Sequence, residues 1–134
     1  MSRHGLIVTG ARAVSPDRAD EVRAALRRHL APHTHYRNKC DVYVGDAPGV
    51  DAIARGMFEH VPNVRLHVFE ASWKQHGRAA GPIRNQEMVD YARSGHVIGM
   101  LEYMAFPGPQ SRGTWDCIKR MADAGIDGRV FGVR

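Results

Sequence analysis

Short apolar runs alternate with amphipathic segments along the chain, and this alternation limits the possible folds more than any other feature. Strands buried on both faces of a sheet read as such runs, and surface helices repeat their apolar residues every three or four positions. The predicted strands lie at residues 5–10, 41–45, 64–69, within 96–106, and 129–133. Strands that alternate with helices form a parallel sheet joined by right-handed crossovers. We predict an α/β, Rossmann-like, doubly wound, mainly parallel five-stranded sheet with helices on both faces.

Proline and glycine punctuate the predicted helices. Ser15 followed by Pro16 is typical of a helix start, and Pro32 ends that helix. Gly81 and Pro82 predict another start, because proline is tolerated in a first helical turn. Arg84 and Asn85 would then follow in that turn. The last helix is expected to carry its apolar residues on one side, namely Trp115, Ile118, Met121 and Ala122.

Length and composition predict one domain over residues 1–134. The chain is 43% apolar and 25% charged, as is ordinary for a globular protein. No apolar run approaches the ~20 residues of a membrane span, and the N-terminus lacks the pattern of a signal peptide. We therefore expect a cytoplasmic protein without a membrane partner, in which Cys40 and Cys117 stay reduced.

The formal charge is +5, and 16 of the 19 cationic residues are arginines. Arginine presents a planar fork that matches phosphate, so this balance favours anionic partners. A solvated basic surface explains the same count equally well. Only arginines in loops that face a ligand therefore count as evidence.

Four polar loops that contain glycine follow the first four predicted strands. In a doubly wound sheet, ligands bind outside the carboxyl ends of the strands, where the strand order reverses. All four loops should lie at that edge, which makes it the predicted site. The loops are Gly10–Arg12, Gly45–Asp51, Ala71–Asn85 and Pro107–Thr114.

The last of these loops has the residues of a phosphate site. Gly108 and Gly113 permit close approach of the backbone, and Ser111, Arg112 and Thr114 offer polar groups at a helix start. The glycine spacing is that of a Walker loop, but Thr114 stands where that loop requires lysine. A nucleoside triphosphate hydrolase is therefore not predicted.

The long connection after the third strand adds cations and an indole. An arginine opposes the dipole of a helix start, so Arg84 is more easily explained if an anion lies beside it. Trp73 is either a core residue or a platform for a base, with Lys74 and Arg78 next to it. Together with Arg12, Arg112 and Thr114, Arg84 would form a phosphate clamp.

Two acids flank the proline and glycine of the second loop. Asp51 either caps the next helix or, like Asp46, accepts hydrogen bonds from ribose hydroxyls. The predicted ligand-binding residues are Gly10, Arg12, Gly45, Asp46, Gly49, Asp51, Trp73, Lys74, Arg78, Arg84, Asn85, Gly108, Ser111, Arg112, Gly113 and Thr114. We assign no metal site and no cofactor, because the spacing of His33, His35 and Cys40 matches no established set of ligands.

The motifs Val-Thr-Gly-Ala-Arg, Gly-Asp-Ala-Pro-Gly-Val-Asp, Ala-Ser-Trp-Lys-Gln-His-Gly-Arg-Ala-Ala-Gly-Pro-Ile-Arg-Asn-Gln-Glu-Met and Phe-Pro-Gly followed by Arg-Gly-Thr resemble the small single-domain SLOG proteins of bacteria and phages. That superfamily includes the lonely-guy phosphoribohydrolases and DNA-processing protein A. The resemblance implies a Rossmann-like domain that binds nucleotides, often as a homo-oligomer. It implies an active-site role for Arg84, and phosphate contacts for Gly113 and Thr114.

The same resemblance shows departures from the hydrolases. Pro109 stands where their second loop glycine would be, and the loop is two residues longer. Cys117 occupies the place of their catalytic glutamate. If the chain is an enzyme, Arg84, Glu87 and Asp116 would be its catalytic residues.

Three functions follow from these observations. The first is a binder of a nucleotide or nucleotide-derived small molecule, acting as a sensor or sequestering protein in antiviral defence. The second is a hydrolase of the N-glycosidic bond of a nucleotide. The third is single-stranded DNA binding, which the scarcity of interleaved aromatic residues disfavours.

Overall fold

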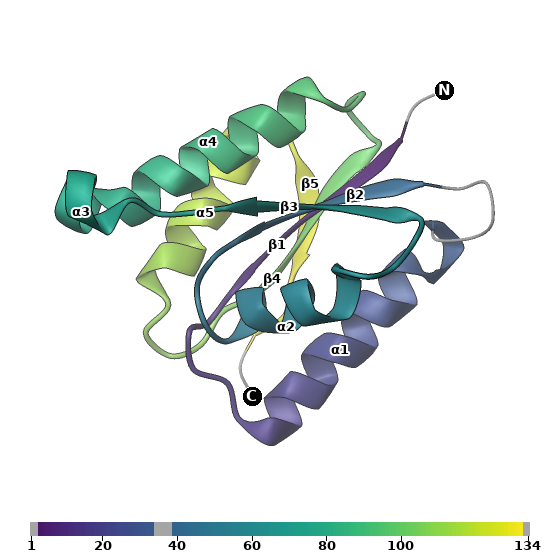
Figure 1. The fold of residues 1–134 in the computed structure, drawn as a ribbon, viewed down its shortest axis with the longest axis horizontal. Coiled ribbons are helices and arrows are strands. Elements are labelled where there is room, and N and C mark those ends of the chain that lie inside the picture. The colour runs from purple at the N-terminus through teal and green to yellow at the C-terminus, as the bar shows by residue number, and fades with distance from the viewer. Residues whose placement is uncertain (1–2, 34–38, 133–134) are drawn as a thin grey trace.

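The computed structural model describes residues 3–33 and 39–132, which form a central sheet covered by helices (Figure 1). Its strands are β1 (His4–Gly10), β2 (Cys40–Gly45), β3 (Val64–Phe69), β4 (Leu101–Phe106) and β5 (Asp127–Val130). Its helices are α1 (Pro16–Leu30), α2 (Val50–Phe58), α3 (Trp73–His76), α4 (Ala80–Ser94) and α5 (Arg112–Asp123). Two 3-10 turns, η1 (Ala31–His33) and η2 (Gly77–Ala79), follow α1 and α3.

The five strands are parallel and lie in the order β3-β2-β1-β4-β5. The chain moves outward from β1 through β2 to β3, and then returns to the other side of β1 for β4 and β5. The order therefore reverses between β1 and β4, where Gly10 pairs with Phe106 at the carboxyl ends. This topology confirms the predicted doubly wound parallel sheet.

Side chains of β1 alternate between two hydrophobic cores. Leu6 and Val8 pack into the core beneath α1 and α2, whereas Ile7 packs into the core beneath α4 and α5. All three are fully buried, as the apolar run predicted for a strand covered on both faces. β1 is therefore the central element of both layers.

Several boundaries agree with the sequence predictions. Ser15 accepts a hydrogen bond from the backbone N–H of Arg18 at 3.2 Å and so caps α1, and β3 spans the predicted 64–69. β5 begins two residues earlier than predicted, and the predicted end of this strand at Val133 lies outside the described residues. Most of the predicted polar loop at 32–39 also lies outside them.

The predicted face of the last helix is only partly correct, because Met121 is buried and Ile118 packs against the core, whereas Trp115 and Ala122 do not. α5 buries Thr114, Cys117 and Met121, whereas Trp115 is 53% exposed and Ala122 is also exposed. Cys117 hydrogen-bonds to Thr9 of β1, so the side of α5 that carries Cys117 faces the sheet. Trp115 was predicted to lie on the apolar side of the helix because it is large and hydrophobic, but this side chain faces outward.

The long connection after β3 contains the short helix α3 and the turn η2 rather than an irregular loop. α4 consequently begins at Ala80, and Pro82 lies in its first turn as predicted. Arg84 and Asn85 lie one turn further along the helix, where both are buried. Because they are buried, these two residues support the loops of the predicted site rather than line its surface.

Gly49 and Gly56 allow a matched test of this backbone. Gly49 precedes α2 with φ +77°, and a Cβ there would collide with the Ala11 carbonyl oxygen. We expect Gly49→Ala to lower the free energy of unfolding by about 1–3 kcal/mol or more, as strained backbone costs. Urea denaturation followed by circular dichroism measures the change.

Gly56 is the control, because it lies inside α2 and a Cβ added to it would meet no atom within 4 Å. Gly56→Ala should raise the free energy of unfolding by about 0.5–1 kcal/mol, since alanine is the better helix former. Equal midpoints for Gly49→Ala and the wild type would contradict the close packing described for the β1 and β2 loops.

Candidate functional site

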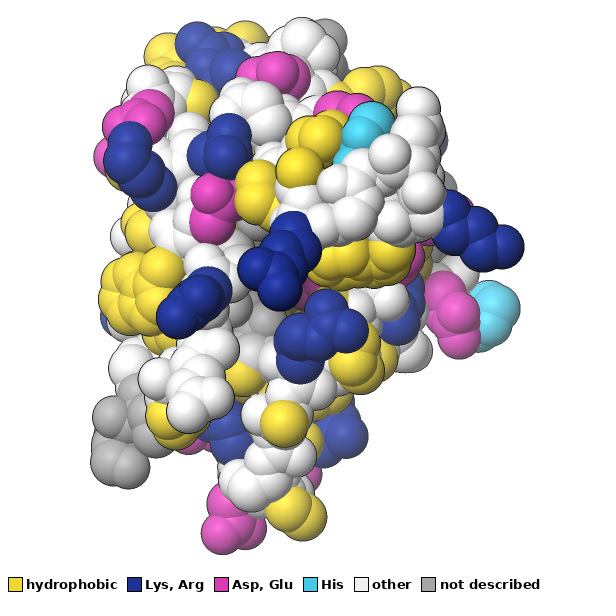
Figure 2. Space-filling model, turned by 90° about the vertical axis from the view of Figure 1, so that its left-hand side faces the viewer, with side chains coloured by type: hydrophobic (Ala, Val, Ile, Leu, Met, Phe, Trp, Pro, Cys, Tyr) yellow, Lys and Arg dark blue, Asp and Glu magenta, His cyan; other side chains and the backbone are white. Residues whose placement is uncertain are grey.

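The four loops predicted to form a site follow the carboxyl ends of β1 to β4 and lead into helices. Figure 2 shows the side of the molecule where α3 lies in Figure 1, with several Lys and Arg side chains around hydrophobic ones. Of the helices that begin at this edge, α1 has a side-chain cap, whereas α2, α4 and α5 have none. Uncapped first turns present backbone N–H groups that can bind an anion.

The start of α5 is the most favourable of these turns. Ser111 occupies the cap position, yet its hydroxyl oxygen accepts a hydrogen bond from the Gly108 N–H at 2.6 Å instead of capping the helix. No acid lies in the first turn, and exposed Arg112 begins it. A Cβ on Gly108 would lie 3.0 Å from that of Ala11, so this loop touches the loop after β1 at the strand-order reversal.

Arg84 ties the neighbouring loops together from below. Its Nη1 donates to Asp46 Oδ1 at 2.9 Å and to the Phe69 carbonyl at 3.4 Å, and its Nε donates to Asn85 Oδ1 at 3.0 Å. The arginine is only 9% exposed. Its charge therefore has a carboxylate partner within the protein, in contrast to the anion that the sequence suggested.

Asn85 extends the same framework to α5. Its Nδ2 donates to the Gly113 carbonyl at 3.1 Å and to Asp116 Oδ2 at 3.0 Å. Arg120 holds the Asp116 carboxylate through two further hydrogen bonds, of 2.9 and 3.1 Å. Partial burial alone would raise the pKa of Asp116, but the donors Arg120 and Asn85 lower it below its ordinary value. Asp116 is thus a carboxylate held in its charged form.

Asp51 is the carboxyl group with the most unusual environment at this edge. It is 5% exposed, and its Oδ2 accepts a hydrogen bond from the Ala47 N–H at 3.3 Å. Gly45 provides room for it, because a Cβ there would collide with both Asp51 Oδ2 and the guanidinium of Arg84. Burial raises the pKa of Asp51 to about 6, although Arg84 opposes the shift. A carboxyl that titrates near neutral pH is a candidate general acid or base.

The remaining predicted residues divide by exposure. Arg12, Lys74, Arg78 and Arg112 are exposed, and Trp73 is 50% exposed with its indole lying over Gly81. Thr114 is buried at 4% exposure. Glu87 lies on the exposed side of α4, away from the buried framework. The exposed cations stay predicted ligand contacts.

Cys117, which stands at the position of the hydrolases' glutamate, is a buried free thiol. Burial raises its pKa to about 12, even though Thr9 hydrogen-bonds to it. The thiol is therefore protonated near pH 7 and does not act as a nucleophile. In the sequence, only its position in the motif distinguishes Cys117. In the structure it packs in the core as a small apolar residue.

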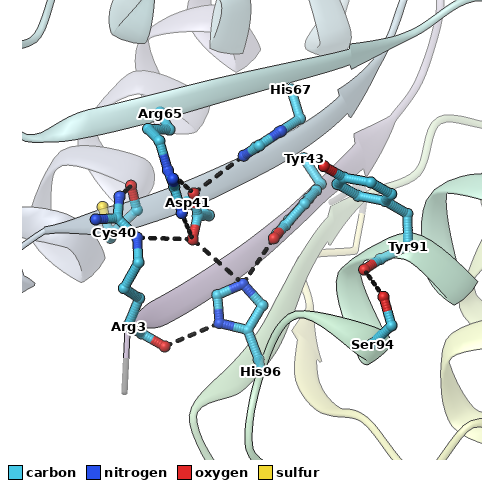
Figure 3. A network of polar contacts seen from close by, with 9 residues as sticks. All are labelled: Arg3, Cys40, Asp41, Tyr43, Arg65, His67, Tyr91, Ser94 and His96. Carbon is cyan, nitrogen blue, oxygen red and sulfur yellow. Dashed lines mark hydrogen bonds and ion pairs between the residues drawn. The ribbon is translucent and has the colours of Figure 1, made fainter. Parts of the chain in front are cut away.

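A second polar network lies at the opposite, amino edge of the sheet (Figure 3). Asp41 of β2 accepts hydrogen bonds from Arg3 at 3.0 Å, from Arg65 at 2.8 Å and from His67 at 3.0 Å. His96 Nε2 lies 3.5 Å from the same carboxylate and 2.7 Å from the Tyr43 hydroxyl. Burial would raise the pKa of Asp41, but these donors hold it well below its usual range. The network joins β2 and β3 to Arg3, which precedes β1, and to His96, which follows α4.

Fold and site together define a doubly wound parallel α/β protein with its polar loops gathered at the carboxyl edge. The Gene 61 protein of Mycobacterium phage D29 is 38% identical over 92 residues, which are 66% of this chain and 68% of that protein. The chain therefore belongs to the family of this phage protein.

Other comparisons are less informative. The crystal structure of phenylacrylic acid decarboxylase from Aquifex aeolicus is similar over 98% of this chain and 81% of that chain, at a TM-score of 0.37 and 11% identity. This likeness is too weak to carry an argument. No protein-family model matches the chain. Among the described residues, no helix has both the length and the apolar character needed to cross a membrane.

The burial of Asp51 predicts how stability depends on pH. The carboxyl has a pKa of about 6 when folded and an ordinary value of 3.8, so between these the folded state binds more protons than the unfolded state. The free energy of unfolding therefore falls as pH rises through this window, by up to about 3 kcal/mol. Asp51→Asn removes the titration and should gain stability relative to the wild type from pH 4 to pH 7.

Urea denaturation of both proteins at each pH unit measures this difference. Asp20→Asn is the matched control, because the side chain of Asp20 is 80% exposed on α1. Its difference from the wild type should stay nearly constant. A pH-independent difference for Asp51→Asn would show that Asp51 titrates in the folded protein as it does in water.

Proposed function

We propose that the protein binds a nucleotide or a nucleotide-derived small molecule at the carboxyl edge of its sheet, as a single SLOG-like domain over residues 1–134. In this role it would act as a sensor or as a sequestering protein for nucleotide signals of antiviral defence. Homo-oligomerisation and a cytoplasmic location remain predictions from the sequence.

The observation that carries the proposal is the start of α5. Its first turn has neither a side-chain cap nor an acid, and it opens with the exposed cation Arg112. The N-terminal end of the helix carries a partial positive charge, and the arginine is positive as well, so the two repel each other without an anion between them. A phosphate placed there would accept hydrogen bonds from the free backbone N–H groups and from the guanidinium. Arg12 lies in the adjoining loop, because Gly108 packs on Ala11.

Neighbouring groups suit the rest of a nucleotide. Asp46 uses Oδ1 to accept from Arg84 and from the Ala71 N–H, and no described residue donates to its Oδ2. That oxygen is suited to a ribose hydroxyl. The exposed indole of Trp73 offers a face on which a base can stack. In this assignment Arg84 and Asn85 position the loops and do not touch the phosphate.

Loss of Arg112 tests the phosphate contact. Calorimetric titration with AMP, ADP-ribose, NAD and cyclic nucleotides should give a Kd for at least one of them. Arg112→Gln should raise that Kd roughly tenfold or more, because a hydrogen bond to a charged group contributes about 1.5–3 kcal/mol. Affinity for the matching nucleoside, which has no phosphate, should stay unchanged.

Arg28→Gln is the matched control, since Arg28 is exposed near the other end of α1 and the net charge changes equally. Its Kd should equal that of the wild type. If both variants raised the Kd equally, the loss of affinity would follow from the lower net charge and not from a contact with Arg112. Binding of single-stranded DNA without binding of any mononucleotide in the panel would contradict the proposal.

A hydrolase of the N-glycosidic bond is the second candidate, and Asp51 is the observation that favours it. Departure of a base requires a proton donor, and a carboxyl with a pKa of about 6 can supply one near neutral pH. Asp116 suits this task less well because Arg120 and Asn85 stabilise its charged form. Glu87 faces solvent on α4.

Release of free base from the bound nucleotide separates the two candidates. If the protein is a hydrolase, chromatography after incubation should detect base and ribose phosphate, and Asp51→Asn should reduce the rate by about 100-fold or more while binding persists. Asp116→Asn should reduce it less. Recovery of intact nucleotide in proportion to protein would leave the binding function alone.

A further inference from the structure

The amino edge of the sheet holds a cluster of imidazoles on the face covered by α1, remote from the proposed nucleotide site. We propose that His4, His29 and Glu102 bind a divalent transition-metal ion of the zinc class. The proposal rests on the juxtaposition of three ligand atoms, on the burial of two imidazole nitrogens, of which His4 Nε2 is unpartnered, and on the chemistry of this donor set.

Three elements bring the residues together. His4 begins β1, Glu102 is the second residue of β4, and His29 lies in the last turn of α1. Glu102 pairs with Leu6, and His4 is two positions before Leu6, so both side chains project from the same face of the sheet. α1 covers that face, and one ligand atom from each residue lies within 4.8 Å of the others.

This spacing suits a metal. Ligand atoms about 2.0–2.2 Å from a tetrahedral zinc lie roughly 3.4 Å from one another. His29 Nε2 and Glu102 Oε2 are already 3.0 Å apart. Small rotations of the three side chains would therefore place an ion between them.

The two imidazoles have few hydrogen-bond partners. His4 Nε2 has none among the described residues, and His29 Nε2 has only the Glu102 carboxylate, 3.0 Å away. His4 is only 7% exposed. Unpartnered buried polar atoms are rare because each loses its hydrogen bonds with water. A metal ion that accepts both lone pairs would compensate for this loss.

Charge agrees with the same assignment. Glu102 supplies a negative charge that offsets part of the charge of the ion.

His33 has a supporting role. Its ring stacks on that of His4 with centroids 3.7 Å apart and planes inclined by 5°. Each imidazole binds a metal in its own plane, so two stacked rings do not share one ion. His33 instead fixes the orientation of His4, as supporting groups do around metal sites. His35, which the sequence placed beside it, lies outside the described residues.

Two imidazoles and one carboxylate form a three-ligand set that leaves a position for water. The Glu102 side chain is 39% exposed and that of His29 is 20% exposed, so this position faces solvent. The donor set suits zinc and related first-row ions rather than magnesium or calcium, which prefer oxygen ligands.

Titration of chelator-treated protein with Zn²⁺ tests the site, and Co²⁺ serves as a spectroscopic probe. We expect one equivalent to bind, the unfolding temperature to rise by several degrees, and Co²⁺ to give the visible absorption of a four-coordinate site. His29→Ala and Glu102→Gln should each weaken Zn²⁺ binding by at least about tenfold. Glu102→Gln keeps the side-chain shape at a partly exposed position, and circular dichroism verifies its fold.

His60→Ala is the control, because its side chain is 89% exposed and lies 3.6 Å from Glu59 in a surface pair. Its Zn²⁺ affinity should equal that of the wild type. Failure of the wild type to take up one equivalent would overturn the proposal. Binding that survives both His29→Ala and Glu102→Gln, or that is lost in His67→Ala instead, would overturn it as well.

Discussion

The buried guanidinium of Arg84 is the interaction on which the carboxyl edge depends. It joins Asp46 after β2, the carbonyl of Phe69 at the end of β3, and Asn85 on its own helix. Asn85 continues the connection to the Gly113 carbonyl and to α5. A guanidinium removed from water is stable only where its donors are satisfied. The loops after β2 and β3 and the start of α5 are thus linked through the solvation of one charge.

The two edges of the sheet use charge differently. At the carboxyl edge, Asp46 is paired with the buried Arg84, whereas several other cations are exposed to solvent, so the surface favours an anion. At the amino edge, Asp41 is surrounded by donors on one face of the sheet, while the imidazoles of His4 and His29 lie on the other. β1 connects these regions, since it begins at His4 and ends at Gly10. One central strand therefore carries groups that face two chemically distinct regions.

Local patterns in the sequence predicted the fold well, and contacts between distant residues account for what they missed. The β3 boundaries and the Ser15 cap follow from short-range signals, namely an apolar run and a serine before proline. The burial of Arg84 does not, because its partner Asp46 is 38 residues away. The outward position of Trp115 depends on how closely α5 approaches Thr9. The raised pKa of Asp51 likewise requires knowledge of its burial.

The uncapped start of α5 connects recognition with folding. In most helices a serine, threonine or acid completes the first turn, and the chain then needs nothing from outside. Here the proposed ligand would take the place of that residue, so it would be a structural component as well as a cargo. Substitutions that add a cap would make the empty protein more durable and, by the same contact, close the site.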